Sequence, residues 1–512
     1  MYCIQDARGN IEQREYYATI WWEPQAWIER CCQSCNAPIR HIQGKRAMWI
    51  KPFTADGQHY VYSAWTNQIA RISPRLHSLF AGNESPSVQG QAAEHLGLLP
   101  TAPQPIDLLS DDTIAAGLAE INQAGPTNLV LTVTEACNFR CRYCAYSGSY
   151  DYSRQHSNIH MAEATATKAI HWYLRFPRQR YHIGFYGGEP LLRRRLIEKA
   201  MCVARENLPA GAELSFGMTS NGWLLDQESV RFLANNCVDL FISLDGPASV
   251  HDRYRLNAHG TPTFDRVWAA IKQIRRLNSD YFERHVNFSI TLAPPDALTE
   301  IEEFVQRNPD IFAGKIPKVG MLNGAPSHVM QSLGVPAGEE RIDCSSLRER
   351  YLTTMIEGGK PDGFSRACVE PSMASIHSRN MAKTATVRIS CGQCTPGVRC
   401  HVTPDGRLHM CEHGDEQRPI GNVDSGFDQA AVEAMLKEFR DFVKPRCKEC
   451  WAVRLCSKCI PQLAAGTTLS DDIFSSLCAS RKANLERDLV DYCRARSRND
   501  GCFDSLPQGT AN

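Results

Sequence analysis

The stretch Cys137-Asn138-Phe139-Arg140-Cys141-Arg142-Tyr143-Cys144 decides how the chain is interpreted. Its cysteines have CxxxCxxC spacing and directly follow the strand-like run NLVLTVT at 128–134. A loop leaving a strand end can fold three thiolates around one iron–sulfur cube, and three cysteines leave one of four irons open. No cysteine follows until Cys202, so the pattern favours a reactive cluster over a closed structural one. Three cysteines that pack as small apolar side chains are the alternative.

Size and composition indicate a globular protein of two to four domains. The formal net charge of zero offers no basic excess for nucleic-acid phosphates. No apolar run could span a bilayer, and the start MYCIQDARGN lacks a signal-peptide pattern, so we expect a cytoplasmic protein that binds neither nucleic acid nor membrane. Twenty-two cysteines in such a chain indicate metal ligation rather than disulfides.

Strand and helix patterns alternate from residue 128 to about 325. The expected strands are 128–134, 182–186, 214–219, 240–244, 286–292 and 318–322, and the expected helices are 162–176, 191–207, 226–235, 264–277 and 298–306. Repeated β-then-α units predict a parallel sheet. Six units are too few for an eight-fold barrel, so we expect an α/β fold with a partial (β/α)6 barrel. Its functional loops should lie at the C-terminal strand ends.

Candidate ligand-binding residues follow successive strands. They are Gly187, Gly188, Glu189 and Pro190 after the second strand, Ser220 and Asn221 after the third, and Ser243, Asp245 and Arg255 after the fourth. Glycines let a ligand approach the backbone, a Glu accepts from an ammonium group, and an Arg binds a carboxylate. A Gly-Gly or Asp-Gly alone is most often just a turn. Their order along the chain makes the set a predicted binding site.

The cysteine motif with an aromatic before its last Cys, followed by GGEP, TSNG at 219–222 and SLDGPASVHDRYR at 243–255, resembles the radical SAM superfamily. The resemblance implies that Cys137, Cys141 and Cys144 hold a 4Fe-4S cluster whose open iron chelates S-adenosylmethionine (SAM). A 5′-deoxyadenosyl radical would then abstract hydrogen from substrate. The GGEP segment would contact the SAM amino group, segment 219–222 the ribose, and Arg255 the carboxylate.

A second cysteine array occupies 391–478. It contains Cys394, Gly406 and Cys411, then Cys447-x2-Cys450-x5-Cys456-x2-Cys459, and finally Cys478. CxxC pairs at this density suit zinc or iron–sulfur clusters, and zinc ribbons are the alternative. The array resembles the SPASM extension of radical SAM enzymes, although two residues rather than three separate Cys456 from Cys459.

The SPASM resemblance implies two auxiliary 4Fe-4S clusters. The first would use Cys391, Cys394, Cys411 and Cys459, with Cys400 competing for the place of Cys391; the second would use Cys447, Cys450, Cys456 and Cys478. Sulfatase-maturing relatives carry an Asp base directly after the cysteine that corresponds to Cys411. Glu412 is therefore the candidate catalytic base, and a surface carboxylate is the alternative.

The flanking regions give weaker signals. Residues 46–82 predict strand, turn, strand and helix, and YVYSAWTNQIARISPRLHSLF at 60–80 resembles a small winged domain whose sheet edge pairs with a leader peptide. An α+β domain without a ligand is equally compatible. Cys31, Cys32 and Cys35 could form half of a zinc or cluster site, but no second group of cysteines that would complete it lies nearby. The predicted boundaries are 1–124 accessory domain and linker, 125–335 core, 336–390 connector, 391–485 auxiliary domain, and 486–512 helix end and tail, disordered from about Ser497.

The run TPGVRCHVTPDGRLHMCE at 395–412 resembles maturases of ribosomally made peptides. The sequence thus predicts a radical SAM enzyme that modifies a genetically encoded peptide or protein, forming a thioether or carbon–carbon cross-link. Electrons would come from an external reductant such as flavodoxin or ferredoxin. A sulfatase-maturing oxidase that makes formylglycine is one alternative. The alternative from another functional class is a non-catalytic binding protein whose chain segments are joined by bound metal.

Overall fold

The computed structural model describes residues 49–83, 86–99, 107–150, 154–295, 297–322, 327–336, 339, 341–379, 386–387, 396–412, 414, 416–457 and 459–506. They belong to one compact unit, Gly44–Asn512. The predictions for Cys31, Cys32, Cys35, Cys391 and Cys394 lie outside the described residues. In the described part, no helix is long and apolar enough to cross a membrane.

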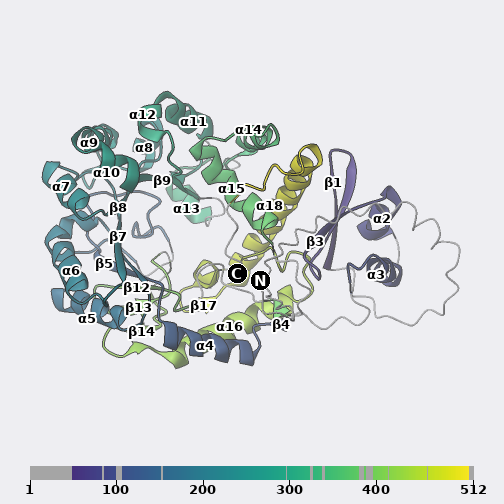
Figure 1. The fold of residues 1–512 in the computed structure, drawn as a ribbon, viewed down its shortest axis with the longest axis horizontal. Helices are drawn as coiled ribbons and strands as arrows, with labels where there is room; N and C mark the ends of the chain where they lie inside the picture. The colour runs from purple at the N-terminus through teal and green to yellow at the C-terminus, as the bar shows by residue number, and fades with distance from the viewer. Residues whose placement is uncertain are drawn as a thin grey trace, which may run out of the picture. The chain divides into compact units, whose positions relative to one another are not determined.

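A ten-stranded sheet in the order β10-β9-β8-β7-β6-β5-β12-β13-β14-β15 forms the centre of this unit (Figure 1). Six parallel strands build its first part: β5 Asn128–Thr134, β6 Arg180–Gly187, β7 Glu213–Ser220, β8 Asp239–Ser243, β9 Val286–Leu292 and β10 Lys318–Met321. The segments between them contain α5 Glu163–Leu174, η3 Pro190–Arg193, α6 Arg194–Glu206, α7 Gln227–Asn235, α8 Ala248–Tyr254, α9 Phe264–Leu277, α10 Ser279–His285, α11 Leu298–Arg307 and α12 Pro309–Phe312. The predicted partial (β/α)6 barrel is confirmed.

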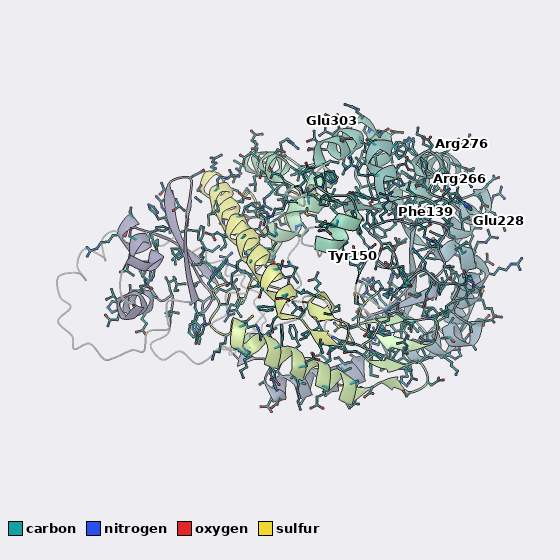
Figure 2. All side chains as sticks on the ribbon, turned by 180° about the vertical axis from the view of Figure 1, so that it is seen from behind. Phe139, Tyr150, Glu228, Arg266, Arg276 and Glu303 are labelled. Atoms are coloured by element: carbon teal, nitrogen blue, oxygen red, sulfur yellow. The ribbon has the colours of Figure 1, made fainter. Side chains whose placement is uncertain are left out.

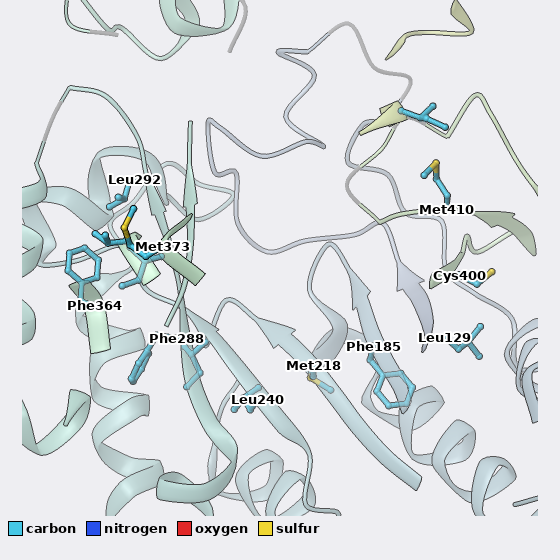
Figure 3. Close-up of a cluster of buried hydrophobic side chains, with 14 of the residues drawn as sticks. Leu129, Phe185, Met218, Leu240, Phe288, Leu292, Phe364, Met373, Cys400 and Met410 are labelled. Atoms are coloured by element: carbon cyan, nitrogen blue, oxygen red, sulfur yellow. The ribbon is translucent and has the colours of Figure 1, made fainter. Parts of the chain in front are cut away.

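Alternation of side chains along the strands gives the sheet two different faces. Leu129, Phe185, Met218, Leu240 and Phe288 come from five neighbouring strands and form one buried apolar layer (Figure 3). Because successive strand residues point to opposite faces, the residues between them line the other face. Those residues are mostly polar or glycine, in contrast to the apolar layer. The second face can therefore receive a polar ligand.

The sheet continues beyond the barrel into the cysteine-rich region, which the sequence did not predict. Strand β12 (Arg399–Val402) lies parallel to β5, with Arg399 opposite Asn128. Strands β13 (Arg407–His409), β14 (Gly421–Asn422) and β15 (Gly426–Phe427) follow antiparallel. Residues 399–427 are thereby fixed to the first barrel strand by backbone hydrogen bonds.

The N-terminal part is a three-stranded antiparallel sheet with short helices. Its elements are β1 Ile50–Ala55, β2 Gln58–Ser63, β3 Gln68–Ile72, α2 Pro74–Ser78, η2 Leu79–Asn83 and α3 Pro86–His95. The predicted helix start is present, since Ser73 caps α2, whereas β3 and α3 were not predicted. The sheet packs on the cysteine-rich segment: Trp49 Nε1 donates to the Lys448 carbonyl (2.9 Å), and Tyr62 meets the Trp451 ring at 6.3 Å.

Helices complete the unit: α4 Asp111–Ala124, α13 Ser327–Ser332, α14 Ser345–Ile356, α15 Gly363–His377, α16 Gln429–Cys447, α17 Ile460–Leu463 and α18 Asp471–Arg498. Short strand pairs join β4 Asp107–Leu108 to β11 Thr386–Val387 and β16 Ala464–Ala465 to β17 Thr468–Leu469. The expected disorder from Ser497 is wrong as far as residue 506. Phe503 is fully buried and stacks on Tyr492 at 5.3 Å, because the apolar residues after α18 fold back onto it.

A buried ion-pair cluster joins α14 to α18, and its removal should destabilise the protein. Arg348 contacts Asp488 and Asp491, each at 2.6 Å, with side chains no more than 11% exposed. Arg348→Met should lower the free energy of unfolding by about 3–5 kcal/mol, because the buried Asp488 loses its cation and Asp491 keeps only the longer contact with Arg494 (3.3 Å). Urea unfolding followed by tryptophan fluorescence measures this.

The matched control is Arg307→Met, which removes the exposed pair with Glu303. It should change stability by no more than about 0.5 kcal/mol. Equal effects of the two substitutions would contradict a structural role for the buried cluster.

Candidate active site

The three cysteines of the 137–144 loop come together at the carboxyl end of β5. Cys141 is buried, and Cys137 and Cys144 are half-buried. The Phe139 amide donates to Cys137 Sγ (3.3 Å) and the Tyr146 amide to Cys144 Sγ (3.4 Å). Burial raises the pKa of Cys137 and of Cys141 to about 12, so these thiols need a cation to become thiolates. Iron supplies that charge, and the donor set fits a cluster.

Aromatic side chains surround this loop. Phe139 is buried and meets Trp223 edge-on at 5.7 Å, and the Tyr150 hydroxyl donates to the Tyr143 carbonyl (3.0 Å). Tyr150 lies toward the middle of the molecule, whereas Arg266 and Arg276 lie farther out, on α9 (Figure 2). The cluster site is thus enclosed by ring systems that limit its contact with water.

The two glycines of GGEP pack against the cysteine loop itself. A Cβ on Gly187 would lie 2.0 Å from the Thr134 carbonyl oxygen, and one on Gly188 would lie 2.2 Å from that of Ala136. The Gly188 amide donates to the Thr134 carbonyl and the Glu189 amide to the Ala136 carbonyl, both at 2.9 Å. Both glycines thus allow a close approach between two parts of the chain, and the predicted approach of a ligand to them stays a prediction. Because neither residue has a side chain, β6 can lie directly against the start of the loop.

Glu189 connects the ends of β6 and β7. Its fully buried carboxylate accepts from the Ser220 hydroxyl (2.9 Å), the Asn221 amide (2.8 Å) and the Leu191 amide (3.1 Å). Burial raises the pKa of Glu189, and these donors oppose the rise. Asn221 in turn donates through Nδ2 to Asn138 (2.7 Å). Glu189 therefore positions the backbone of its neighbours, whatever it contacts on a ligand.

A network at the end of β8 holds Arg255 beside the cysteines. Arg255 Nη1 donates to the Tyr143 hydroxyl (2.7 Å), which donates to Asp245 Oδ2. Asp245 Oδ1 accepts from the Thr291 amide (2.9 Å). Burial would lower the pKa of Arg255, but nearby Cys141, Tyr143 and Asp245 raise it, so the guanidinium stays charged.

Arg255 retains a buried donor for a ligand. Its Nε is buried and has no hydrogen-bond partner among the described residues, and the same is true of Asn138 Nδ2. A buried donor without an acceptor is unfavourable, so both atoms are suited to an acceptor that arrives with a cofactor. A carboxylate such as that of SAM fits beside the cysteines. The remaining predicted residues frame this place: Ser243 ends β8, and the buried Pro190 begins η3.

The auxiliary cysteines lie in two neighbouring places. Cys456, Cys459 and Cys478 line one cavity. Cys411 lines another, together with Ile460. Cys447 is buried at the end of α16, and Cys450 follows one turn later. In the described ranges, no group of three or more His, Cys, Asp or Glu side chains is arranged to hold a single metal ion.

Cys400 occupies the apolar layer of the sheet. It is fully buried in β12, opposite Leu129 in register, and both lie in that layer (Figure 3). Burial raises the pKa of this thiol. For Cys400 to bind iron, it would have to leave the core. This favours Cys391 as the fourth ligand of the first auxiliary cluster.

Glu412 is buried, and the alternative of a surface carboxylate is wrong. Only 5% of the residue is exposed. Its Oε1 pairs with Arg399 Nη2 at 2.5 Å, and its carbonyl accepts from Arg154 Nη1 at 2.5 Å. Two arginines therefore hold Glu412 in place, one at its carboxylate and one at its backbone carbonyl.

Two positively charged side chains near Glu412 come from the first residues of two strands of the large sheet. Arg399 is the first residue of β12 and Lys318 the first of β10. Lys318 Nζ lies 3.6 Å from the centroid of the Phe241 ring. Burial lowers the pKa of His182, and Arg399 and Lys318 lower it further. This polar, charged face is suited to a substrate with polar groups.

Comparison with known proteins defines the class. Residues 131–307 match the model of the Radical SAM superfamily. Together with the cysteine loop and the fold, this match assigns a radical SAM domain to residues 131–307, the domain of a class of enzymes that use SAM and a 4Fe-4S cluster.

The relatives include maturases. The chain is 25% identical over 154 residues to the cysteine-type anaerobic sulfatase-maturating enzyme of Clostridium perfringens, covering 30% of this chain and 42% of that protein. It is 27% identical over 149 residues to the serine-type enzyme of Bacteroides thetaiotaomicron, covering 29% and 36%. It therefore matches less than half the length of these curated relatives. The structure of native anSMEcpe with bound AdoMet and the Cp18Cys peptide superposes with a TM-score of 0.53 at 18% identity, covering 73% of this chain and 99% of that chain.

Sequence reasoning missed several residues of the site. The sequence motif identified Tyr143 only as the aromatic residue before the last cysteine. In the structure its hydroxyl joins Asp245 to Arg255. Arg154 carried no signal, since a lone Arg after a loop is normally solvated. Arg399 was not singled out in the sequence, and the antiparallel pairing of β12 with β13 brings it to Glu412.

The close approach at Gly188 predicts a specific defect. Gly188→Ala should displace the start of the cysteine loop, because the new methyl group would overlap the Ala136 carbonyl. The reconstituted variant should contain about four fewer irons per chain than wild type, one cubane. Iron and sulfide analysis checks this.

The control is Gly117→Ala in α4, where a Cβ meets no atom within 4 Å. This variant should keep its iron, and Ala should favour the helix. Full iron in Gly188→Ala would show that the loop tolerates the displacement.

Tyr143→Phe should weaken SAM binding. The change removes the hydroxyl that accepts from Arg255 and leaves the ring in place. We expect the dissociation constant of SAM to rise about ten-fold, the effect of losing a hydrogen bond to a charged group. Equilibrium binding to reconstituted protein measures it, and unchanged affinity with normal iron would exclude a role for the hydroxyl.

Proposed function

We propose that this enzyme modifies a peptide or protein by hydrogen abstraction. The observation that carries the proposal is the enclosed cysteine loop with Arg255 beside it, facing the polar side of the barrel. Cluster and SAM, when bound, supply a 5′-deoxyadenosyl radical that removes hydrogen from substrate. Cys137, Cys141 and Cys144 hold the cluster, and Arg255 binds the SAM carboxylate. The backbone of Gly187 to Pro190 and the 219–222 segment position the amino group and ribose.

Two auxiliary clusters form part of the proposal. The first uses Cys391, Cys394, Cys411 and Cys459, and the second uses Cys447, Cys450, Cys456 and Cys478. Cys459 lines a cavity with Cys456 and Cys478, while the next residue, Ile460, lines the cavity of Cys411. A ligand at this boundary suits an interleaved pair of clusters. Such clusters can accept an electron from a substrate radical, and an external flavodoxin or ferredoxin reduces the SAM cluster.

The proposed product is a thioether or a carbon–carbon cross-link. Glu412 is the candidate base, and Arg399 contacts its carboxylate at 2.5 Å. The similarity to sulfatase-maturating enzymes favours a second candidate, oxidation of Cys or Ser to formylglycine. Both reactions use a peptide substrate, and the related structure with a bound peptide supports that class. Incubation with a precursor peptide distinguishes them, because a cross-link loses two hydrogens while keeping both side chains, whereas formylglycine forms an aldehyde that hydrazides label.

The N-terminal sheet is the proposed site for a leader peptide. Strand β3 hydrogen-bonds to β2 on one side, and no strand of the described residues pairs with its other side. An edge of this kind can accept an added strand.

Iron content and SAM cleavage test the class of chemistry. Anaerobically reconstituted wild type should hold about twelve irons, three cubanes, and release 5′-deoxyadenosine under reduction. A Cys137/Cys141/Cys144→Ala variant should hold about eight and release none. Zinc in place of iron, with no cleavage in either protein, would instead support a metal-stapled binding protein.

Removal of iron should unfold the auxiliary region. Metal sites that several chain segments share contribute their binding energy to folding. Limited proteolysis of the iron-free protein should cleave within 391–478 much faster than in the holoprotein. An unchanged cleavage pattern would show that bound metal does not hold residues 391–478 in their folded form.

A further inference from the structure

Arg154 is a buried arginine that the proposed chemistry does not use. Its residue is 3% exposed. Its Nη1 donates to the carbonyls of Glu412 (2.5 Å) and Gly414 (3.1 Å), and its Nη2 donates to the Tyr146 hydroxyl (2.5 Å). Its Nε lies 3.1 Å from Glu416 Oε1. Burying a charge is unfavourable unless it is paired and hydrogen-bonded, and Arg154 meets both conditions.

These contacts join two segments that are far apart in sequence. Tyr146 lies two residues after Cys144, and its ring also lies beneath the Arg154 guanidinium, 4.4 Å away. Glu412 directly follows Cys411, and Gly414 and Glu416 belong to the same turn. One side chain therefore holds the end of the SAM-cluster loop and the segment after Cys411 in fixed relation. The distance between radical source and substrate must be reproducible to a fraction of an ångström for hydrogen transfer.

The charge of Arg154 also reaches the cysteine loop. Its guanidinium lies over the Tyr146 ring, and the Tyr146 amide donates to Cys144 Sγ at 3.4 Å. A nearby positive charge stabilises a thiolate, and it stabilises a reduced cluster more than an oxidised one, since reduction adds a negative charge. Glu416 offsets part of the charge through its contact with Nε.

We propose that Arg154 is a positioning residue that couples the SAM-cluster loop to the Cys411 segment and raises the reduction potential of the SAM cluster. The inference rests on the proposed function, in which Cys144 and Cys411 bind two different clusters. It makes two separable claims: hydrogen bonds to carbonyls fix the 411–416 segment, and the positive charge tunes the cluster.

Two substitutions separate these claims. Arg154→Lys keeps the charge but cannot reproduce the fork that spans two carbonyls and a phenol. Arg154→Gln removes the charge as well. The matched control is Arg178→Gln: Arg178 also donates to two carbonyls, those of Ala124 and Pro126, and lies over a tyrosine ring, but away from both cysteine groups.

All proteins are studied as reconstituted full-length holoproteins. EPR-monitored reductive titration measures the midpoint potential of the SAM cluster. Hydrogen exchange read by mass spectrometry measures protection of the peptides that cover 144–156 and 411–418. Neither measurement requires the substrate.

We expect Arg154→Gln to shift the midpoint to more negative potential and Arg154→Lys to keep it near wild type. Both should exchange several-fold faster at 411–418, and Arg178→Gln should change neither quantity. An unchanged potential in Arg154→Gln, or an equal shift in Arg178→Gln, would overturn the charge claim. Wild-type protection of 411–418 in Arg154→Lys would overturn the positioning claim, and this variant carries the test alone if Arg154→Gln does not fold.

Failure of the proposed function gives a different result. Wild type without iron, or without SAM cleavage, would contradict that function before any variant is compared. Wild type with both, but with variants indistinguishable from it, would contradict only the role of Arg154.

Discussion

The close contact between β5 and β6 at their carboxyl ends is the constraint on which the site depends. Gly187 and Gly188 let the backbone of β6 reach the carbonyls of Thr134 and Ala136, where any side chain would overlap them. That contact fixes the first turn of the cysteine loop. Glu189 then ties the same point to Ser220 and Asn221 of β7. Three strand ends are thus held together before any cofactor binds.

The other side of β5 carries the second constraint. Strand β12 pairs with β5, so the array that contains Cys411 is an extension of the barrel sheet and not an independent module. The first barrel strand therefore connects to both cysteine groups, one through the loop at its end and one through its neighbour. Arg154 closes the same connection with side-chain contacts.

The alternating part of the fold was predictable because its signals are local. Apolar strands such as Val286–Leu292 and amphipathic helices such as Phe264–Leu277 carry their period in the sequence, and both were predicted with the observed bounds. Strands of two to four residues, such as Gly426–Phe427, have no period to read, and their pairing depends on distant partners. The burial of Phe503 was missed for the same reason, since a short apolar group after a charged helix resembles a tail.

The site was predictable where chemistry imposes spacing, and unpredictable where a side chain acts by contact across the fold. Cysteine ligands and a Gly-Gly turn have fixed neighbours in sequence. The partner of the Glu412 carboxylate, in contrast, is Arg399, thirteen residues away on strand β12. That pairing changes the chemistry expected of the carboxylate. The guanidinium holds one carboxylate oxygen, Oε1, in direct contact. In the proposed reaction the proton would come from a C–H next to a radical centre, which loses its proton far more readily than a saturated C–H.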